Sequence, residues 1–177
     1  MFKNVARRAW RAVKECILPG SDEVVVYTDG ACDPNPGVGG WAAVLRYKDH
    51  YKEISGGEPQ STNNRMELTA AIRALEALKR PSNVLLHTDS EYLQKGVTLW
   101  LPAWKRLNWR RKTGEIKNID LWRRLDELIQ THDVVWQWVR GHAGDPLNER
   151  CDELATGEIE KLRARKLRGH VRPTKNR

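Results

Sequence analysis

The sequence lacks any long hydrophobic run, and it has little cysteine. No apolar stretch approaches the ~20 residues that a membrane-spanning helix needs, so we expect no membrane contact. The three cysteines, Cys16, Cys32 and Cys151, form no CxxC pair and cannot all pair with one another, so a reduced, intracellular setting fits best. The chain also lacks internal repeats, and its 177 residues suit one domain with a sizeable core.

Acidic residues are missing from one end of the chain. Residues 161–177 hold eight Lys or Arg and no acid, and residues 1–20 hold five basic residues against Glu15. Residues 21–160 hold 18 basic and 22 acidic residues, so the middle is mildly acidic although the net charge is +8. A basic protein often binds nucleic acid. Here that inference concerns the two ends, for which a solvated tail is an equally good interpretation.

The first 18 residues have the pattern of a short basic amphipathic helix. Apolar residues recur at helical spacing until Leu18-Pro19-Gly20-Ser21 interrupts the pattern. Three interpretations compete: an arm that grips phosphates, a helix packed on the domain, and a targeting peptide. The last is disfavoured because the segment has little serine.

Hydrophobic periodicity predicts both strands and helices. We expect strands over residues 23–28, 41–47, 51–55, 83–88 and 134–139, with loops over 33–40 and 56–59. We expect helices from Ser61 or Thr62 to about Lys79, over residues 90–95, 99–106 and 118–130, and from Pro146 into the basic tail. This order predicts an α/β (mixed α+β) domain, in which helices flank a five-stranded mixed sheet.

Four acidic residues lie where folding alone does not require them. Asp29 follows the first strand and Asp89 the fourth, and ligand sites gather at strand ends in such sheets. Glu67 lies between apolar residues of the next helix, and Asp152 lies early in the last helix. Each also has an ordinary explanation, as a turn residue, a helix cap, a partner of the helix dipole or a solvated acid.

Taken together, these acids indicate a metal site. Converging carboxylates repel one another, and divalent cations that take oxygen ligands remove that cost. Two such ions about 4 Å apart activate a water and stabilise the leaving oxygen of a phosphodiester. The spacing in the sequence permits this convergence without establishing it.

Six segments of the chain resemble, in order, the motifs of type 1 ribonuclease H. They are Thr28-Asp29-Gly30-Ala31-Cys32, Asn35-Pro36-Gly37-Val38-Gly39-Gly40, Thr62-Asn63-Asn64-Arg65-Met66-Glu67-Leu68, Thr88-Asp89-Ser90, Gly141-His142-Ala143-Gly144 and Asn148-Glu149-Arg150-Cys151-Asp152-Glu153-Leu154-Ala155. The resemblance is nearest to the bacterial branch. It implies the ribonuclease H fold, with the first three strands antiparallel, in a catalytic domain over residues 23–157. Basic extensions over residues 1–22 and 158–177 flank that domain.

The resemblance implies an endonuclease that hydrolyses the RNA strand of RNA–DNA hybrids. Asp29, Glu67, Asp89 and Asp152 match the family's metal-binding acids, which hold two Mg²⁺ ions, or Mn²⁺ in their place, bridged by the scissile phosphate. In-line attack by water then leaves 5′-phosphate and 3′-hydroxyl ends. His142 matches the family's catalytic-loop histidine, which assists proton transfer or product release, and glycines on both sides give its loop freedom to move.

The same resemblance implies the substrate contacts. A hybrid is distinguished through RNA 2′-hydroxyl groups and the minor groove. The matching positions are Asn63 and Asn64 for the groove, Cys32 and Asn35 near the RNA strand, and Thr62 and Asn118 for a phosphate of the DNA strand.

A basic, tryptophan-containing stretch matches the basic protrusion of bacterial members. Residues 105–117 carry six basic residues against Glu115. The matching positions are Trp100, Trp104 and Trp109 with Lys105, Arg106, Arg110, Arg111, Lys112 and Lys117. The resemblance implies that they grip the DNA strand through phosphates and aromatic contact. The helical spacing of Trp100 and Trp104 places part of the set in the core.

One position departs from the family pattern. Glu91 stands where bacterial relatives often have glutamine near the substrate. An acid there either weakens substrate binding or faces solvent.

Three other functions fit the sequence less well. A non-catalytic hybrid-binding module is disfavoured because all four acidic positions are filled. Other nucleases of the superfamily lack the motifs at residues 63–67 and 141–144. The nuclease domain of a reverse transcriptase is disfavoured because the chain begins at Met1 and holds no polymerase sequence. We expect a free-standing, monomeric, cytoplasmic enzyme whose partner is an RNA–DNA hybrid.

Overall fold

The computed structural model describes residues 22–111 and 114–170. Its elements are β1 (Glu23–Asp33), β2 (Gly37–Tyr47), β3 (His50–Ser61), α2 (Asn63–Glu76), β4 (Asn83–Thr88), α3 (Glu91–Lys95), the π-helical turn η1 (Gly96–Trp100), α4 (Leu101–Arg106), α5 (Ile119–Thr131), β5 (Asp133–Trp138) and α6 (Pro146–His170). The helix predicted over residues 1–18 lies outside the described residues. Within the described ranges, no helix has both the length and the apolar character needed to span a membrane.

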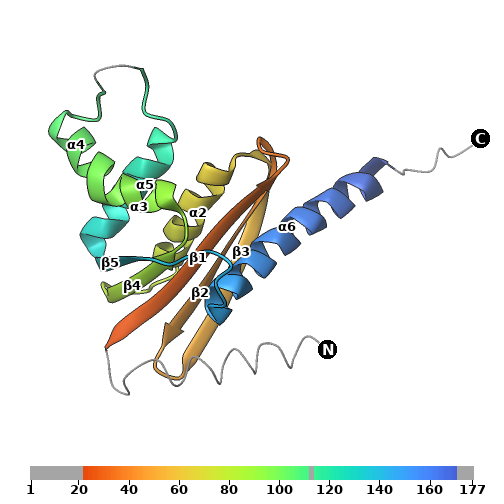
Figure 1. Ribbon diagram of the computed structural model, residues 1–177, viewed down its shortest axis with the longest axis horizontal. Helices are drawn as coiled ribbons and strands as arrows, with labels where there is room; N and C mark the ends of the chain where they lie inside the picture. Colours follow the sequence, from red (N-terminus) through yellow and green to blue (C-terminus); the bar gives the residue numbers. More distant parts are fainter. Residues whose placement is uncertain (1–21, 112–113, 171–177) are drawn as a thin grey trace, which may run out of the picture.

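The strands form one mixed sheet of five in the order β3-β2-β1-β4-β5 (Figure 1). β2 pairs antiparallel with β1 and β3, whereas β4 pairs parallel with β1 and β5. Val24, Val25 and Val26 are buried in β1 because this central strand is covered by helices on both faces. The predicted α/β class and the antiparallel arrangement of the first three strands are confirmed.

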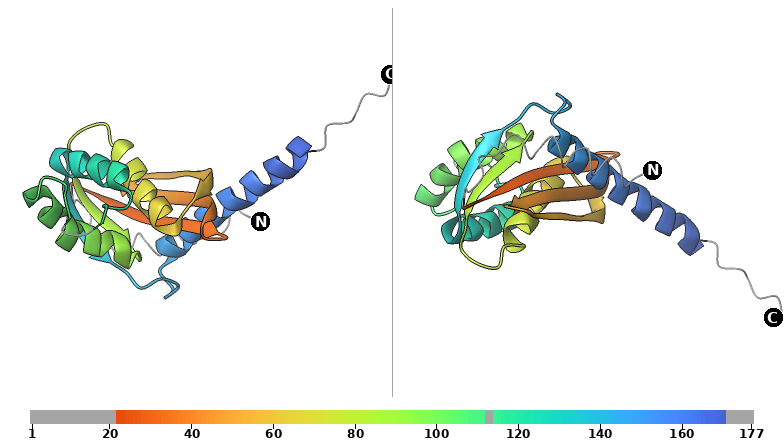
Figure 2. Two further views of the ribbon diagram at one scale, coloured as in Figure 1. Left: turned by 90° about the horizontal axis from the view of Figure 1, so that it is seen from above. Right: turned by 90° about the horizontal axis from the view of Figure 1, so that it is seen from below.

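Alternate residues of β2 face different layers of helices, as the two-residue period of a strand requires. Ala43 and Leu45 belong to the larger core, which α2 and α5 cover, whereas Ala42 and Val44 pack against α6. Figure 2 shows α6 on one face of the sheet and α2 with α5 on the other. The sheet is therefore the middle layer of three.

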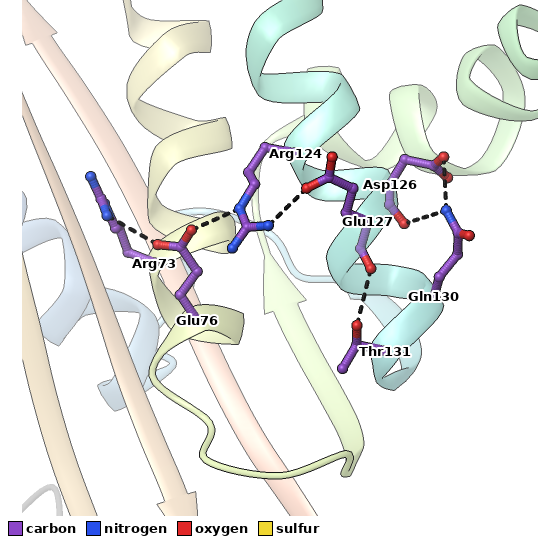
Figure 3. A network of polar contacts seen from close by, with 7 residues as sticks. All are labelled: Arg73, Glu76, Arg124, Asp126, Glu127, Gln130 and Thr131. Atoms are coloured by element: carbon purple, nitrogen blue, oxygen red, sulfur yellow. Dashed lines mark hydrogen bonds and ion pairs between the residues drawn. The ribbon is translucent and has the colours of Figure 1, made fainter.

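Ion pairs align α2 with α5 (Figure 3). Nε of Arg124 donates to Oε1 of Glu76 at 2.9 Å, and Arg73 donates to the other carboxylate oxygen of Glu76 at 3.0 Å. Nearer the start of both helices, Arg65 donates two hydrogen bonds to the Asp120 carboxylate. Since these pairs are partly exposed, each contributes at most about 1 kcal/mol. Their effect is to set the relative orientation of the two helices.

Three strands are longer than the sequence pattern predicts. β1 runs on beyond residue 28 to Asp33, so Asp29 lies within the strand and not at its end. β2 already begins at Gly37, and β3 continues through residues 56–59 to Ser61, where loops were expected. The expectation was wrong because glycine-rich composition was taken as a loop signal.

The glycines in these strands allow a helix to approach the sheet. A Cβ at Gly40 would lie 2.0 Å from the carbonyl oxygen of Ala155, and one at Gly57 would lie 2.7 Å from the Leu162 side chain. Both contacts are with α6, so the missing side chains make room for that helix. A strand that contains several glycines for this reason has an amino-acid composition like that of a loop.

The helices also differ in detail from the prediction. α2 ends at Glu76, earlier than the expected Lys79. The helices expected over residues 90–95 and 99–106 are joined without a break by η1. Gly96 begins that turn, and a Cβ there would lie 1.9 Å from the Trp122 ring. Close packing against α5 thus requires glycine at this position.

Candidate active site

Three of the four predicted acids converge. Asp29 lies in β1, Glu67 lies in the second turn of α2, and Asp89 follows the end of β4. One carboxylate oxygen from each lies within 4.8 Å of the other two. The parallel pairing of β1 with β4, in which Thr28 is the partner of Thr88, sets Asp29 and Asp89 side by side.

The second acid, Glu67, reaches the sheet because β1 has no side chain at the next position. A Cβ on Gly30 would lie 2.2 Å from the backbone nitrogen of Glu67, which only glycine avoids. The N-terminus of α2 is fixed by Thr62, whose hydroxyl accepts a hydrogen bond from the Arg65 amide at 3.3 Å. The helix thus presents Glu67, only 5% exposed, to the sheet.

Asp89 is held from several directions. The Nδ2 amide of Asn148 donates to Oδ2 of Asp89 at 3.0 Å, and the indole of Trp138 donates to the Asp89 carbonyl at 3.1 Å. A Cβ at Gly141 would lie 2.7 Å from the same Oδ2 atom, so the glycine loop lies directly against the carboxylate. Ser90, which caps α3, fixes the backbone on the other side.

Burial and mutual repulsion perturb the acids strongly. Removal from water, and then the charges of Asp89 and Asp152, raise the pKa of Asp29 from 3.8 to about 7. Burial and the same kind of repulsion raise the pKa of Glu67 well above its usual range. The Oε2 atom of Glu67 is buried and has no hydrogen-bond partner among the residues that the structure describes. Clustered carboxylates with an unpartnered buried oxygen fit a hard divalent cation.

The other two predicted catalytic residues lie beside this group. Asp152, in α6, is half-buried and is not one of the three converging acids, yet its charge raises the pKa of Asp29. His142 is exposed in the loop before α6, with a left-handed φ of 52°, and its charge lowers the pKa of Asp29. Both therefore lie within electrostatic reach of the group without joining it.

Several of the predicted substrate contacts lie together at one end of β1. The side-chain oxygen of Asn35 accepts from the Asn63 amide at 3.2 Å, and the thiol of Cys32 donates to the Ser61 carbonyl at 3.4 Å. These contacts join the β1–β2 turn to the start of α2, where Asn64 is exposed. The predicted groove-reading residues thus form one continuous surface.

The tryptophans of the predicted basic protrusion are half-buried and pack against the larger core. The rings of Trp100 and Trp104 lie 6.0 Å apart, and Trp104 meets Trp122 edge-on at 5.6 Å. Tyr92 joins the same cluster, and its hydroxyl accepts from Asn118 at 3.4 Å. The helical spacing of the tryptophans placed part of the basic protrusion in the core, and the residues that pack there in this way are Trp100 and Trp104.

The remaining described residues of that set are exposed basic side chains and the half-buried Trp109, whereas Lys112 lies outside the described residues. Lys105 makes an ion pair with Asp126 at 2.7 Å, and Arg106 is exposed. The Trp109 ring lies 5.4 Å from the Arg123 guanidinium. Glu91, the departure from the family pattern, is exposed and paired with Lys95 at 2.6 Å, so it faces solvent.

No role was predicted for Asn148 from the sequence, although it lies in one of the six motif segments. The structure places it against Asp89, with only 2% of the side chain exposed. A signal was present, because Asn148 lies four residues before Asp152 and thus on the same helix face. A buried amide four residues before Asp152 on the helix is therefore directed toward the group of acids.

A hollow of about 1110 Å³ lies elsewhere, at the opposite end of the sheet. It is lined by the start of β4, the β2–β3 turn and the segment after α2, and it contains none of the converging acids. We assign the chemistry to the acid group because it concentrates the perturbed carboxylates, whereas this hollow does not.

Comparison with known proteins identifies the family. The model of the RNase H family matches residues 21–160. The chain is 61% identical over 144 residues to ribonuclease H of Thiobacillus denitrificans, covering 81% of this chain and 97% of the relative. It is 56% identical over 146 residues to ribonuclease HI of Pseudomonas aeruginosa, covering 82% of this chain and 99% of the relative.

Solved structures agree with this result. LC9-RNase H1, a type 1 RNase H with the type 2 active-site motif, is similar with a TM-score of 0.73 and 31% identity, over 82% of this chain and 75% of that one. LC11-RNase H1, solved in complex with an RNA/DNA hybrid, has a TM-score of 0.59 at 23% identity, over 78% and 97% of the two chains. The second likeness supports the fold alone.

Proposed function

The chain belongs to the ribonuclease H family, and from this premise we propose that it is an endonuclease that hydrolyses the RNA strand of RNA–DNA hybrids. The observation that carries the proposal is the buried group of Asp29, Glu67 and Asp89. Such a group is costly to fold and has no packing purpose, so it favours a catalytic role. The expected products carry 5′-phosphate and 3′-hydroxyl ends.

Asp29, Glu67, Asp89 and Asp152 would hold two Mg²⁺ ions, for which Mn²⁺ would substitute. The oxygen-only donor set and the unpartnered Oε2 of Glu67 fit such ions. When bound, the ions activate a water and stabilise the charge that develops on the scissile phosphate and the leaving oxygen.

The protein's own residues prepare this site. Asn148 holds one oxygen of Asp89, and the amide of Gly30 donates to Oδ1 of Asp29 at 2.7 Å, so both carboxylates have fixed orientations. His142 would move a proton at the leaving oxygen or assist product release. Its exposure and the adjoining Gly144, with a φ of 85°, suit a mobile loop residue.

Substrate selection would come from two surfaces. Asn63 and Asn64, with Cys32 and Asn35 beside them, would read the minor groove and the RNA 2′-hydroxyls. Basic side chains such as Lys105 and Arg106, together with Trp109, would hold the DNA strand, and Thr62 and Asn118 would hold one of its phosphates. The indoles of Trp100 and Trp104 would contribute mainly by fixing α4.

We also propose that the enzyme acts as a monomer in the cytoplasm. All the acids of the group come from one chain, so a second copy is not needed to complete the site. The catalytic domain would comprise residues 23–157, with basic extensions on either side, although α6 runs without a break through the second boundary.

A hybrid labelled on each strand in turn tests the proposal. The protein should cut the RNA strand internally, only with Mg²⁺ or Mn²⁺, and should leave RNA–RNA and DNA–DNA duplexes intact. Asp89→Asn should abolish cutting, whereas the matched control Asp49→Asn, in the exposed β2–β3 turn, should not. Hybrid binding without cleavage in either metal would instead identify a non-catalytic binding module.

A further inference from the structure

The second half of α6 leaves the domain. Ile159 is the last residue of the helix in the buried core, at 3% exposed, whereas Leu167 is 72% exposed. Figure 2 shows this part of the helix projecting beyond the edge of the sheet in both views. We call residues 161–170 the α6 extension.

The α6 extension is a helix of one charge. It contains five Lys or Arg residues and no acid. Lys161 is paired with Glu158 at 2.6 Å on the preceding turn, which only partly offsets the repulsion between Lys161 and Arg165, two like charges one helical turn apart. Leu162 and Arg163 contact the sheet, whereas Arg165 and Leu167 are exposed, and a short helical segment with so little tertiary packing is only marginally stable in water. A negatively charged partner would remove the repulsion and stabilise the extension.

The base of the extension is attached to the predicted RNA-contact surface. Arg163 donates at 2.6 Å both to the carboxylate and to the carbonyl oxygen of Asp33. Asp33 ends β1 and is followed by the turn that carries Asn35. In Figure 1 the extension and α4 lie on opposite sides of the molecule. The turn that carries Asn35 therefore adjoins the base of the extension.

We propose that the α6 extension binds backbone phosphates of the hybrid outside the stretch that crosses the acid group. This inference rests on the proposed function. The extension is about 15 Å long at 1.5 Å per residue. That length corresponds to about four or five phosphates of one strand at 3.4 Å each. A long hybrid would then contact α4 on one side of the acids and the extension on the other.

The composition of the extension favours nucleic acid over a lipid surface. Its large apolar residues are only Leu162 and Leu167, and Leu162 lies against Gly57 of the sheet. A membrane-bound helix needs a wide apolar face, which this helix lacks. Basic side chains on a polar helix suit regularly spaced phosphates.

The test compares hybrids of two lengths. We would replace Lys161, Arg165 and Lys166 together by glutamine, which keeps helix propensity, and leave Arg163 in place to hold the helix on Asp33. The matched control carries Lys52→Gln, Lys79→Gln and Arg80→Gln, three exposed residues at the opposite end of the sheet. Both variants lower the net charge equally. Binding is measured in EDTA, so that nothing is cut. The two hybrids have about 10 and about 24 base pairs, so the long one extends past the short one at each end by more than the length of the extension.

Wild type and the control should bind the long hybrid more tightly than the short one, and the α6 variant should lose most of this advantage. If all three phosphate contacts are made, the slope of log affinity against log salt on the long hybrid falls by about 2.7. The ratio of wild-type to variant affinity for the long hybrid should then be about 40-fold larger at about 50 mM salt than at about 200 mM salt.

Equal affinities and salt slopes for wild type and the α6 variant on the long hybrid would overturn the inference. An equal loss on both lengths, or the same loss in the control, would also overturn it, because the effect would then be one of net charge. If wild type binds anionic vesicles and the α6 variant does not, while both bind the hybrid equally, the partner of the extension is a membrane. Cleavage of the short hybrid by wild type in Mg²⁺ tests the proposed function separately.

Discussion

Replacing Asp29 by asparagine should stabilise the metal-free protein while it abolishes cleavage. Asp29 is buried among other acids, and its pKa is raised from 3.8 to about 7 in the folded state. The unfolded chain therefore loses this proton at lower pH than the folded chain does. Between about pH 4 and pH 7 the folded state holds a proton that the unfolded state has released, so the free energy of unfolding falls as pH rises through this window.

The magnitude follows from the size of the shift. A difference from 3.8 to about 7 corresponds to about 4 kcal/mol at 1.36 kcal/mol per pKa unit. Asparagine removes the charge and keeps an oxygen that accepts from the Gly30 amide. We expect Asp29→Asn to raise the free energy of unfolding by about 2–4 kcal/mol in EDTA at about pH 8. The lower value applies if Asp89 and Glu67 still repel each other in the variant.

Urea unfolding in EDTA at about pH 5.5 and about pH 8 provides the assay. For a slope of about 2 kcal/mol/M, the midpoint of the variant should lie about 1–2 M above that of wild type at the higher pH, with a smaller difference at the lower pH. Mg²⁺ should stabilise wild type selectively, by about 2.7 kcal/mol at 100 times its dissociation constant. Asp49→Asn, in an exposed turn, should behave as wild type.

A variant no more stable than wild type at the higher pH would refute the electrostatic reasoning. Wild-type stability that does not change between the two pH values would refute it equally.

Three further changes test the surroundings of the site. Asn148→Ala removes the donor to Asp89, so the Mg²⁺ concentration for half-maximal cleavage should rise about 10-fold or more; an unchanged Mg²⁺ titration would exclude this positioning role. Gly30→Ala would place a Cβ 2.2 Å from the Glu67 nitrogen, and urea unfolding should show a loss of about 3 kcal/mol. Trp104→Ala should cost about 3 kcal/mol because its ring packs on neighbouring indoles, whereas Trp104→Phe should cost much less. If Trp104 acted only at the substrate surface, both Trp104 variants would unfold like wild type.

Much of the fold followed from local patterns. The valine-rich start of β1 predicted a buried strand, and the apolar face of α2 predicted a helix that covers the sheet. Asp29, Glu67 and Asp89 stood out because each is an acid in an apolar or strand-end setting. Their convergence depends on pairing between β1 and β4, which are far apart in the sequence, so spacing alone did not establish it.

Other features were hidden because one residue type serves two purposes. Glycine marks loops, but at Gly40 and Gly57 it makes room for α6 within paired strands. Tryptophan marks both cores and nucleic-acid surfaces, and only the ring contacts of Trp104 assign it to packing. Asn148 carries no charge, so nothing in its identity indicates that it holds an acid.

The parallel pairing of β1 with β4 has a consequence for folding. Parallel neighbours need a long crossover, so Asp29 and Asp89 meet only after the intervening strands and α2 have assembled. Contacts between residues so distant in the chain form slowly and late. Asn148 adds a contact from the last helix. Charge repulsion among the acids therefore arises only once β1, β4 and α2 have assembled. Cleavage activity during refolding should consequently appear with the final native structure.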